Sequence, residues 1–330
     1  MQKTAKNGNP DATKRRKAVK PQGLMVLGMH RSGTSAMSRV LNLLGCALAD
    51  ELLDAGTGNE TGHWEALDLV RLNDKLLASA GTGWYDCNPI FDDWRSSAIY
   101  SDMIARAAAV VSDHASRGPL FVYKDPRSSR VADVWIEASK EAGVSPLALV
   151  MIRNPAEVAV SLKGRDLMNG GYAELLWLRY TLDAEYLTRG CTRTFGRYDQ
   201  LISNWQQLVG KIKKDLKIAL PRNSAKVQRE IDEFLQADLR HHDFDPELMI
   251  NDLRYTQWLR DTFGIMMRWT ETGEDAADYP ALEQIRAEFD KACAALARVL
   301  QDDELVGEAG VGPGLTAELE AATSRSLLGH

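Results

Sequence analysis

A glycine-containing loop between an apolar run and a periodic helical segment most constrains how this chain can fold. The apolar run reads LMVL over 24–27, and the loop reads GMHRSGTS over 28–35. Apolar residues then recur at helical spacing at Met37, Val40 and Leu41. The pattern predicts a buried strand, a tight loop and a helix, as in an α/β domain with a parallel sheet.

The same loop is suited to bind an anion. Its glycines, Gly28 and Gly33, let backbone N–H groups converge, and the following helix points its positive end at the same place. Loops that bind nucleoside triphosphates place a lysine directly after the second glycine, where this chain has Thr34. The one basic residue of the loop, Arg31, stands too early to follow a triphosphate. A short phosphate-bearing donor is therefore expected, and the alternative is a strand-to-helix turn without a ligand.

A second strand of this kind reads LALVMI over 147–152 and ends at Arg153. Asn154 can cap the next helix, which would start with a proline, and Glu157 completes an arrangement like a capping box. Ser161 lies about two turns into that helix. Taken alone, Arg153 is interpreted as half of a surface ion pair and Ser161 as a serine bonded to its own helix.

A third strand, LFVY over 120–123, is followed by Lys124 and by Asp125, a candidate cap. Ligands of open α/β sheets bind at the carboxyl ends of the strands. If the three strands are neighbours, Arg31, Lys124 and Arg153 converge on one crevice. The alternative for Lys124 is a solvated lysine beside a turn.

The RSGTS motif over 31–35, together with Arg153 and Ser161, resembles the 5′-phosphosulfate loop and the 3′-phosphate site of sulfotransferases. These enzymes use 3′-phosphoadenosine-5′-phosphosulfate (PAPS), and the arginine in the loop is typical of a bacterial branch. The resemblance implies a P-loop-type three-layer α/β fold with a central parallel sheet and a largely helical C-terminal half. It also implies that Lys124 faces the transferring sulfuryl group. The late Arg-Lys-Gly loop of the family is not found, so the residues that close over adenine are unassigned.

The resemblance also points to nucleotide-binding residues. The segment TFGRY over 194–198 looks like the family's tyrosine-containing strand, which predicts a nucleotide contact for Tyr198, or else a half-buried strand aromatic. The predicted donor-binding residues are His30, Arg31, Ser32, Gly33, Thr34, Ser35, Arg153, Ser161 and Tyr198.

An acceptor hydroxyl needs a proton acceptor within hydrogen-bond reach. The segment NETGHWE over 59–65 offers Glu65, which we rank first, and His63, and His30 is a third candidate. Trp64 could form a wall for a sugar or another ring. The alternative for Glu65 is an acidic residue that interacts with the dipole of the following helix. The predicted catalytic residues are Arg31, Glu65, Lys124 and His63.

The expected reaction is transfer of a sulfuryl group from PAPS to a hydroxyl, or to an amine, of a small-molecule or glycan acceptor such as a carbohydrate or glycolipid. The transfer is an in-line displacement that releases 3′-phosphoadenosine-5′-phosphate (PAP). No metal is expected, because the sulfuryl group carries less charge than a γ-phosphoryl and the six histidines are scattered. The alternatives are a P-loop kinase that uses ATP and Mg²⁺, and a non-catalytic nucleotide-binding protein.

Composition sets the domain limits. Residues 1–20 hold seven basic residues and one acidic residue and are expected to be a disordered basic tail, whereas residues 21–330 carry a net charge of −12. Such an acidic body argues against nucleic acid as a partner. We expect one α/β domain over 21–302 and a loosely packed tail over 303–330.

No apolar run reaches the length of about 18 residues that a membrane span requires. The four cysteines, Cys46, Cys87, Cys191 and Cys293, are widely spaced and include no Cys-x-x-Cys. That usage suits a reducing compartment and predicts a cytoplasmic protein. The sequence leaves the acceptor and the oligomeric state open.

Overall fold

The strand order of the sheet places the three predicted strand ends next to one another. The computed structural model describes residues 20–54, 62–238 and 245–306. Within them, four parallel strands are arranged in the order β2-β1-β3-β4. The strands are β1 (Gln22–Leu27), β2 (Leu120–Tyr123), β3 (Ser145–Ile152) and β4 (Thr192–Arg197). Because β2, β1 and β3 are adjacent and parallel, Lys124, the loop at 28–33 and Arg153 all leave the sheet at one edge.

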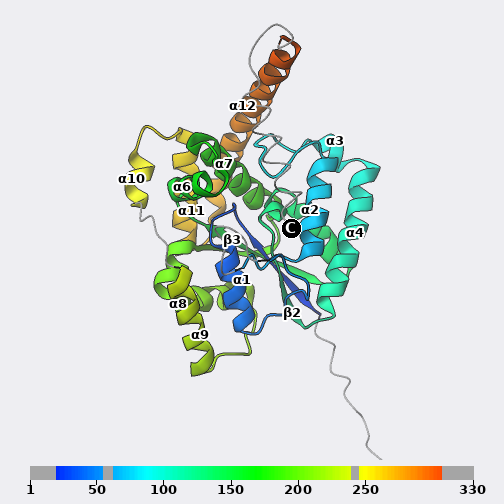
Figure 1. Ribbon diagram of the computed structural model, residues 1–330, viewed down its shortest axis with the longest axis vertical. Coiled ribbons are helices and arrows are strands. Elements are labelled where there is room, and N and C mark those ends of the chain that lie inside the picture. Colours follow the sequence, from blue (N-terminus) through cyan, green and yellow to red (C-terminus); the bar gives the residue numbers. More distant parts are fainter. Residues whose placement is uncertain (1–19, 55–61, 239–244, 307–330) are drawn as a thin grey trace, which may run out of the picture.

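Helices cover both faces of this sheet (Figure 1). One face is packed by α1 (Thr34–Leu43), α8 (Tyr198–Leu216) and α9 (Ala225–Asp238). The other is packed by α2 (Leu67–Ser79), α4 (Ala98–Ala115), α5 (Ala132–Glu141), α6 (Pro155–Asp166), α7 (Gly170–Leu187), α11 (Gln257–Thr272) and α12 (Tyr279–Val306). Short turns of helix are α3 (Asp92–Arg95), η1 (Pro126–Arg130), α10 (Pro246–Asn251) and η2 (Ala276–Asp278).

Strand β1 shows why the sheet needs two covered faces. Leu24 and Val26 point into the core formed with α1 and α8, and Met25 and Leu27 point into the core on the opposite face. All four are fully buried. Apolar side chains on both faces are typical of a parallel strand between two helical layers. The predicted P-loop-like three-layer α/β fold is confirmed.

The C-terminal half is largely helical, as predicted, and β4 is its one strand among the described residues. Tyr198, expected within a strand, begins α8 instead, because the chain changes from extended backbone at Arg197 to helix at that point. Helix α12 extends to Val306. Residues 303–306, predicted as the start of a loosely packed tail, thus continue this helix. The rest of the predicted tails over 1–20 and 303–330, apart from residue 20, lies outside the described residues. No described helix is both long enough and apolar enough to cross a membrane.

Candidate functional site

The loop between β1 and α1 needs glycine at two positions. Gly28 has a φ of +137°, and a Cβ there would lie 2.5 Å from the carbonyl oxygen of Met151. Gly33 has a φ of +82°, and a Cβ there would overlap the ring of Tyr198. The amide N–H of Gly28 donates to Ser129 Oγ at 2.9 Å. The loop is therefore packed tightly between β3, η1 and the start of α8, and only glycine fits at these two positions.

Arg31 joins this loop to helix α6. Its φ of +68° lies in the left-handed region, which is uncommon for a residue with a side chain and is often found at functional sites. Its Nε donates to Ser161 Oγ at 2.8 Å, and its carbonyl oxygen accepts from Arg153 Nη1 at 3.0 Å. Ser161 is thus hydrogen-bonded to Arg31, in the loop that follows β1. The alternative of a serine bonded only to its own helix is wrong.

Besides its bond to the Arg31 carbonyl, Arg153 has three further contacts at the end of β3. Its Nε donates to Glu157 Oε2 at 2.7 Å, and its guanidinium lies 4.3 Å from the ring centroid of Tyr198. Trp177 Nε1 donates to its carbonyl oxygen at 3.0 Å. Only 9% of the Arg153 side chain is exposed, so the ion pair with Glu157 is not a surface pair. The predicted nucleotide residues Arg153 and Tyr198 are therefore in direct contact.

Lys124 is the centre of the site. Its Nζ donates to Glu65 Oε1 at 2.5 Å, to Ser35 Oγ at 2.9 Å and to the carbonyl oxygen of His63 at 2.9 Å. Lys124 is 2% exposed and Glu65 is 5% exposed. The alternatives of a solvated lysine and of a glutamate that faces only the dipole of α2 are both wrong. The first-ranked base and the predicted sulfuryl-facing lysine form a buried ion pair.

The two histidines near Lys124 are neutral at neutral pH. Burial, followed by the positive charges of Arg165, Arg127 and Lys124, lowers the pKa of His30 well below its usual value. Burial, followed by Lys124, Arg165 and Arg31, lowers the pKa of His63 to about 4. A neutral imidazole can accept a proton, so both residues remain candidate bases.

Two buried polar atoms of the loop lack a partner among the described residues. They are Ser32 Oγ and His30 Nε2. A buried polar group without a hydrogen bond is costly, and such atoms at a site of this kind are satisfied by a ligand or by water. The loop therefore presents unsatisfied polar groups beside Lys124 and Arg31. Thr34, also predicted to bind the donor, is buried as the first residue of α1.

A cavity of about 70 Å³ adjoins Arg153 at the carboxyl ends of β3 and β4. Arg197 lines it from the end of β4, Asp199 lines it from the start of α8, and Phe263 and Met267 line it from α11. The cavity is thus lined by charged side chains from the strand ends and α8 and by apolar side chains from α11. The sequence did not predict that α11 would reach this edge of the sheet.

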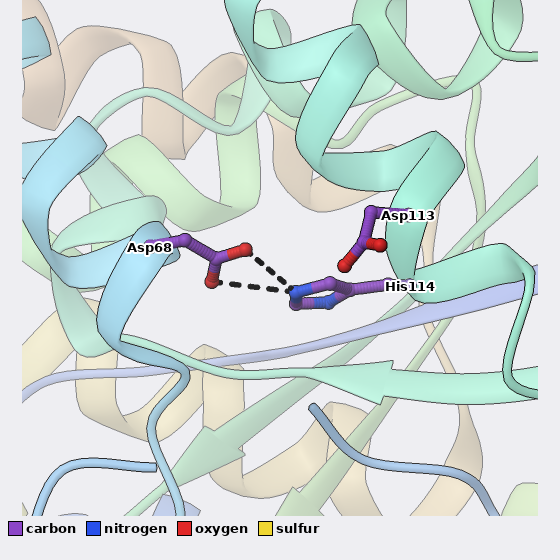
Figure 2. Close-up of side chains that lie close together, drawn as sticks. All are labelled: Asp68, Asp113 and His114. Atoms are coloured by element: carbon purple, nitrogen blue, oxygen red, sulfur yellow. Dashed lines mark hydrogen bonds and ion pairs between the residues drawn. The ribbon is translucent and has the colours of Figure 1, made fainter. Parts of the chain in front are cut away.

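A separate cluster has the composition of a metal site. Asp68 lies at the start of α2, and Asp113 and His114 lie at the end of α4 (Figure 2). Their charges are already compensated, because His114 Nε2 lies 3.1 Å from Asp68 Oδ2 and Arg117 Nη1 donates to Asp113 Oδ2 at 2.6 Å. We interpret the cluster as an ion-pair network that joins α2 to α4.

Sequence analysis missed the aromatic surroundings of His30. The ring centroid of Trp84 lies 5.1 Å from that of His30, and that of Tyr180 lies 5.7 Å away. The guanidinium of Arg165 lies 5.9 Å from the Trp84 ring. One signal was available, because Arg165 follows Ser161 by one helical turn and so shares its face. By contrast, the ring of Trp64, the predicted acceptor wall, packs 4.6 Å from the guanidinium of Arg39 on α1.

The strand-end site thus defines the chain as a P-loop-like α/β protein whose glycine-containing loop is flanked by basic side chains. No family model matches the sequence, and comparison with curated proteins finds no match either. Among solved structures, the sulfotransferase domain from the Synechococcus PCC 7002 olefin synthase is similar, with 18% identity over 76% of this chain and 98% of that chain and a TM-score of 0.41. The sulfotransferase domain from the curacin biosynthetic pathway is also similar, with 17% identity over 75% of this chain and 98% of that chain and a TM-score of 0.39. At these low scores, neither similarity decides what this chain does.

Proposed function

We propose that this protein is a PAPS-dependent sulfotransferase that transfers a sulfuryl group to a hydroxyl of a small-molecule or glycan acceptor. The observation that carries the proposal is the buried contact between Glu65 and Lys124 directly beside the phosphate-type loop. It brings a proton acceptor and a cation together at the place where a group held by the loop would be transferred. The donor supplies the sulfuryl group and a 5′-phosphate leaving group.

In this proposal Lys124 stabilises negative charge that develops on the leaving oxygen. Its ammonium already contacts Ser35 at the start of α1, so it lies where a group at the helix N-terminus would be bound. Glu65 accepts the proton of the acceptor hydroxyl. Both side chains are buried, and a site that excludes water strengthens each electrostatic interaction.

Arg153 and Ser161 would bind the 3′-phosphate of the donor, and Arg31 of the 5′-phosphosulfate loop would hold Ser161 in place for it. The guanidinium of Arg31 points to Ser161, and that of Arg153 lies over Tyr198 beside the 70 Å³ cavity. These contacts bring two guanidinium groups and a hydroxyl together beside the loop. Such groups suit a second phosphate, which PAPS has and ATP lacks at that position.

The kinase alternative requires a carboxylate that is available to hold Mg²⁺. Asp125, the acidic residue at the end of β2, is fully buried, and its carboxylate accepts from Asn73 Nδ2 at 2.9 Å and from the Arg127 amide at 3.1 Å. It is thus engaged in capping η1. This arrangement favours a donor whose charge is balanced by Lys124 and the arginines.

Calorimetry in EDTA with PAP, ADP and AMP tests the donor. We expect PAP to bind at least about tenfold more tightly than ADP or AMP, which corresponds to about 1.4 kcal/mol or more. R153A should remove most of that preference. Arg189 is a matched control, because it also pairs with a glutamate one helical turn away and lies 4.0 Å from the Tyr279 ring centroid, remote from the loop. R189A should retain the preference.

Equal binding of PAP and AMP by the wild-type protein would contradict the donor assignment. Binding of ADP that appears only when Mg²⁺ is restored would support the kinase instead. If PAP binds with the expected preference but no acceptor is turned over, a non-catalytic nucleotide-binding protein is indicated. Screening of hydroxyl-bearing glycans and small molecules with PAPS, with release of PAP as the readout, then decides between these two.

A further inference from the structure

The fold brings together two cysteines that are 206 residues apart in the sequence. Cys87 lies between α2 and α3, and Cys293 lies on α12. Their sulfur atoms are 3.6 Å apart, and the residues are only 8% and 2% exposed. A disulfide has an S–S distance of about 2.05 Å, so the sulfurs need to approach by only about 1.5 Å to bond. The spacing of cysteines in the sequence gave no sign of this pair.

The environment of the pair makes Cys87 the more reactive thiol. The hydrogen bond from Cys293, opposed by burial, lowers the pKa of Cys87 to about 7, and the nearby Arg179 acts in the same direction. The same contact raises the pKa of Cys293. Burial instead raises the pKa of Cys46 to about 12 and that of Cys191 to about 11. Since the thiolate is the nucleophile, Cys87 should react before the other cysteines.

The segment that carries Cys87 is clamped through consecutive backbone carbonyls. Tyr180 and Tyr172 donate to the carbonyls of residues 84 and 85 at 2.7 and 2.8 Å. Arg130 donates to those of residues 86 and 88 at 2.6 Å, and Arg179 donates to that of Cys87 at 2.8 Å. A shift of Cys87 therefore strains contacts along the whole segment, including the backbone of Trp84, whose ring packs on His30.

We propose that Cys87 and Cys293 are a peroxide-reactive dithiol whose disulfide joins α12 to the 84–88 segment and displaces the Trp84 ring beside His30. The Cys87 thiolate attacks one oxygen of hydrogen peroxide, the O–O bond breaks, and the departing hydroxide takes a proton to become water. The Cys293 sulfur then attacks the resulting sulfenic acid, the S–S bond forms, and the S–O bond breaks with loss of a second water. Two thiols lose two electrons, and the peroxide is reduced to two waters.

The consequence of this displacement for the site around His30 rests on the proposed function, whereas formation of the disulfide does not. The full-length protein is treated with one equivalent of hydrogen peroxide, unfolded, alkylated and digested. We expect the number of free thiols to fall from four to two and one cross-linked peptide pair to contain Cys87 and Cys293, with reversal by dithiothreitol. C87S and C293S should each abolish this pair. C191S is the matched control and should form the disulfide as the wild type does.

Displacement of Trp84 is tested separately by tryptophan fluorescence. Oxidation should change the emission of the wild-type protein, and the change should be smaller in W84F. Retention of four free thiols, or oxidation of Cys191 before Cys87, would overturn the assignment of the reactive pair. A disulfide that forms without any fluorescence change would overturn the link to Trp84. Both outcomes are independent of whether PAP binds, so they are distinct from failure of the proposed function.

Discussion

Lys124 and Glu65 lie 59 residues apart in the sequence, yet their side chains form an ion pair of 2.5 Å in a buried position. Desolvation of two charges is expensive, and a buried pair is often no more stable than apolar residues of the same size. Its position at the carboxyl edge of the sheet is what the proposed catalytic role requires, and its contribution to stability can be measured apart from that role.

Replacement of the lysine separates these roles. K124M should lower turnover at least about 100-fold, which is the usual effect of removing a group that stabilises developing charge. It should also lower the free energy of unfolding by about 3–5 kcal/mol, since Glu65 is left as an unpaired buried charge. Steady-state kinetics and urea unfolding measure the two effects.

The control is K140M, because Lys140 is exposed and pairs with Glu137 on its own helix. It should change neither quantity appreciably. The double variant K124M/E65Q should recover part of the stability but not the turnover. Recovery of turnover by the double variant would contradict the catalytic assignment.

The contact between Arg31 and Ser161 should contribute to PAP affinity. R31K retains the charge but replaces a planar fork with a compact ammonium, so the bond to Ser161 is lost. We expect PAP to bind about tenfold more weakly to R31K, with a smaller effect on AMP. S161A should act through the same contact, so the two changes in binding free energy should not be additive. Additive effects in a double-mutant cycle would show that the contact between Arg31 and Ser161 does not contribute to PAP affinity.

Gly33 tests the packing of the loop. G33A places a methyl carbon 2.3 Å from Cδ2 of Tyr198, whose ring also contacts the guanidinium of Arg153, and it adds the strain of a positive φ. Gly143 has a φ of +70° with open space around its Cβ position, so G143A isolates the backbone strain of about 1–2 kcal/mol. Thermal unfolding should show a larger loss for G33A, together with weaker PAP binding. Similar losses would indicate that Tyr198 is free to move.

The pKa of His63 predicts a pH effect on stability. It is about 4 in the folded protein and about 6.5 when unperturbed, so between these values the unfolded chain binds more protons. The free energy of unfolding should therefore fall as the pH falls from 6.5 to 4, and the buried His30 acts in the same direction. Urea unfolding across this range should show a shallower dependence in H63Q. An unchanged slope would mean that His63 has the same pKa in the folded and the unfolded protein.

The pair of Asp68 and His114 should stabilise the packing of α2 on α4 without a metal. Burial would raise the pKa of Asp68, but the hydrogen bond to His114 and the nearby charges lower it overall. Its contribution is present above pH 4 and is lost as the carboxylate is protonated at lower pH. D68N should lower the free energy of unfolding by up to about 1 kcal/mol, whereas EDTA should leave the melting temperature unchanged. A decrease in melting temperature with EDTA would instead reveal a bound ion.

The sequence by itself determined the local structure of the site. The glycines at 28 and 33, the apolar runs before them and before Arg153, and the capping residues Asn154 and Asp125 each act within a few residues. Strand, turn and helix start depend on such short-range preferences, which is why the strand ends and their charges could be assigned.

Only the tertiary structure decided which side chains meet. The order β2-β1-β3-β4 set Lys124 against Glu65 and Arg31 against Ser161, and the packing of α7 and α12 brought Trp84 to His30 and Cys87 to Cys293. These pairs are separated by tens to hundreds of residues, and their formation depends on the packing of whole helices and strands. No local pattern encodes such a distance, because a side chain's long-range partner is fixed by the burial of apolar surface elsewhere in the chain.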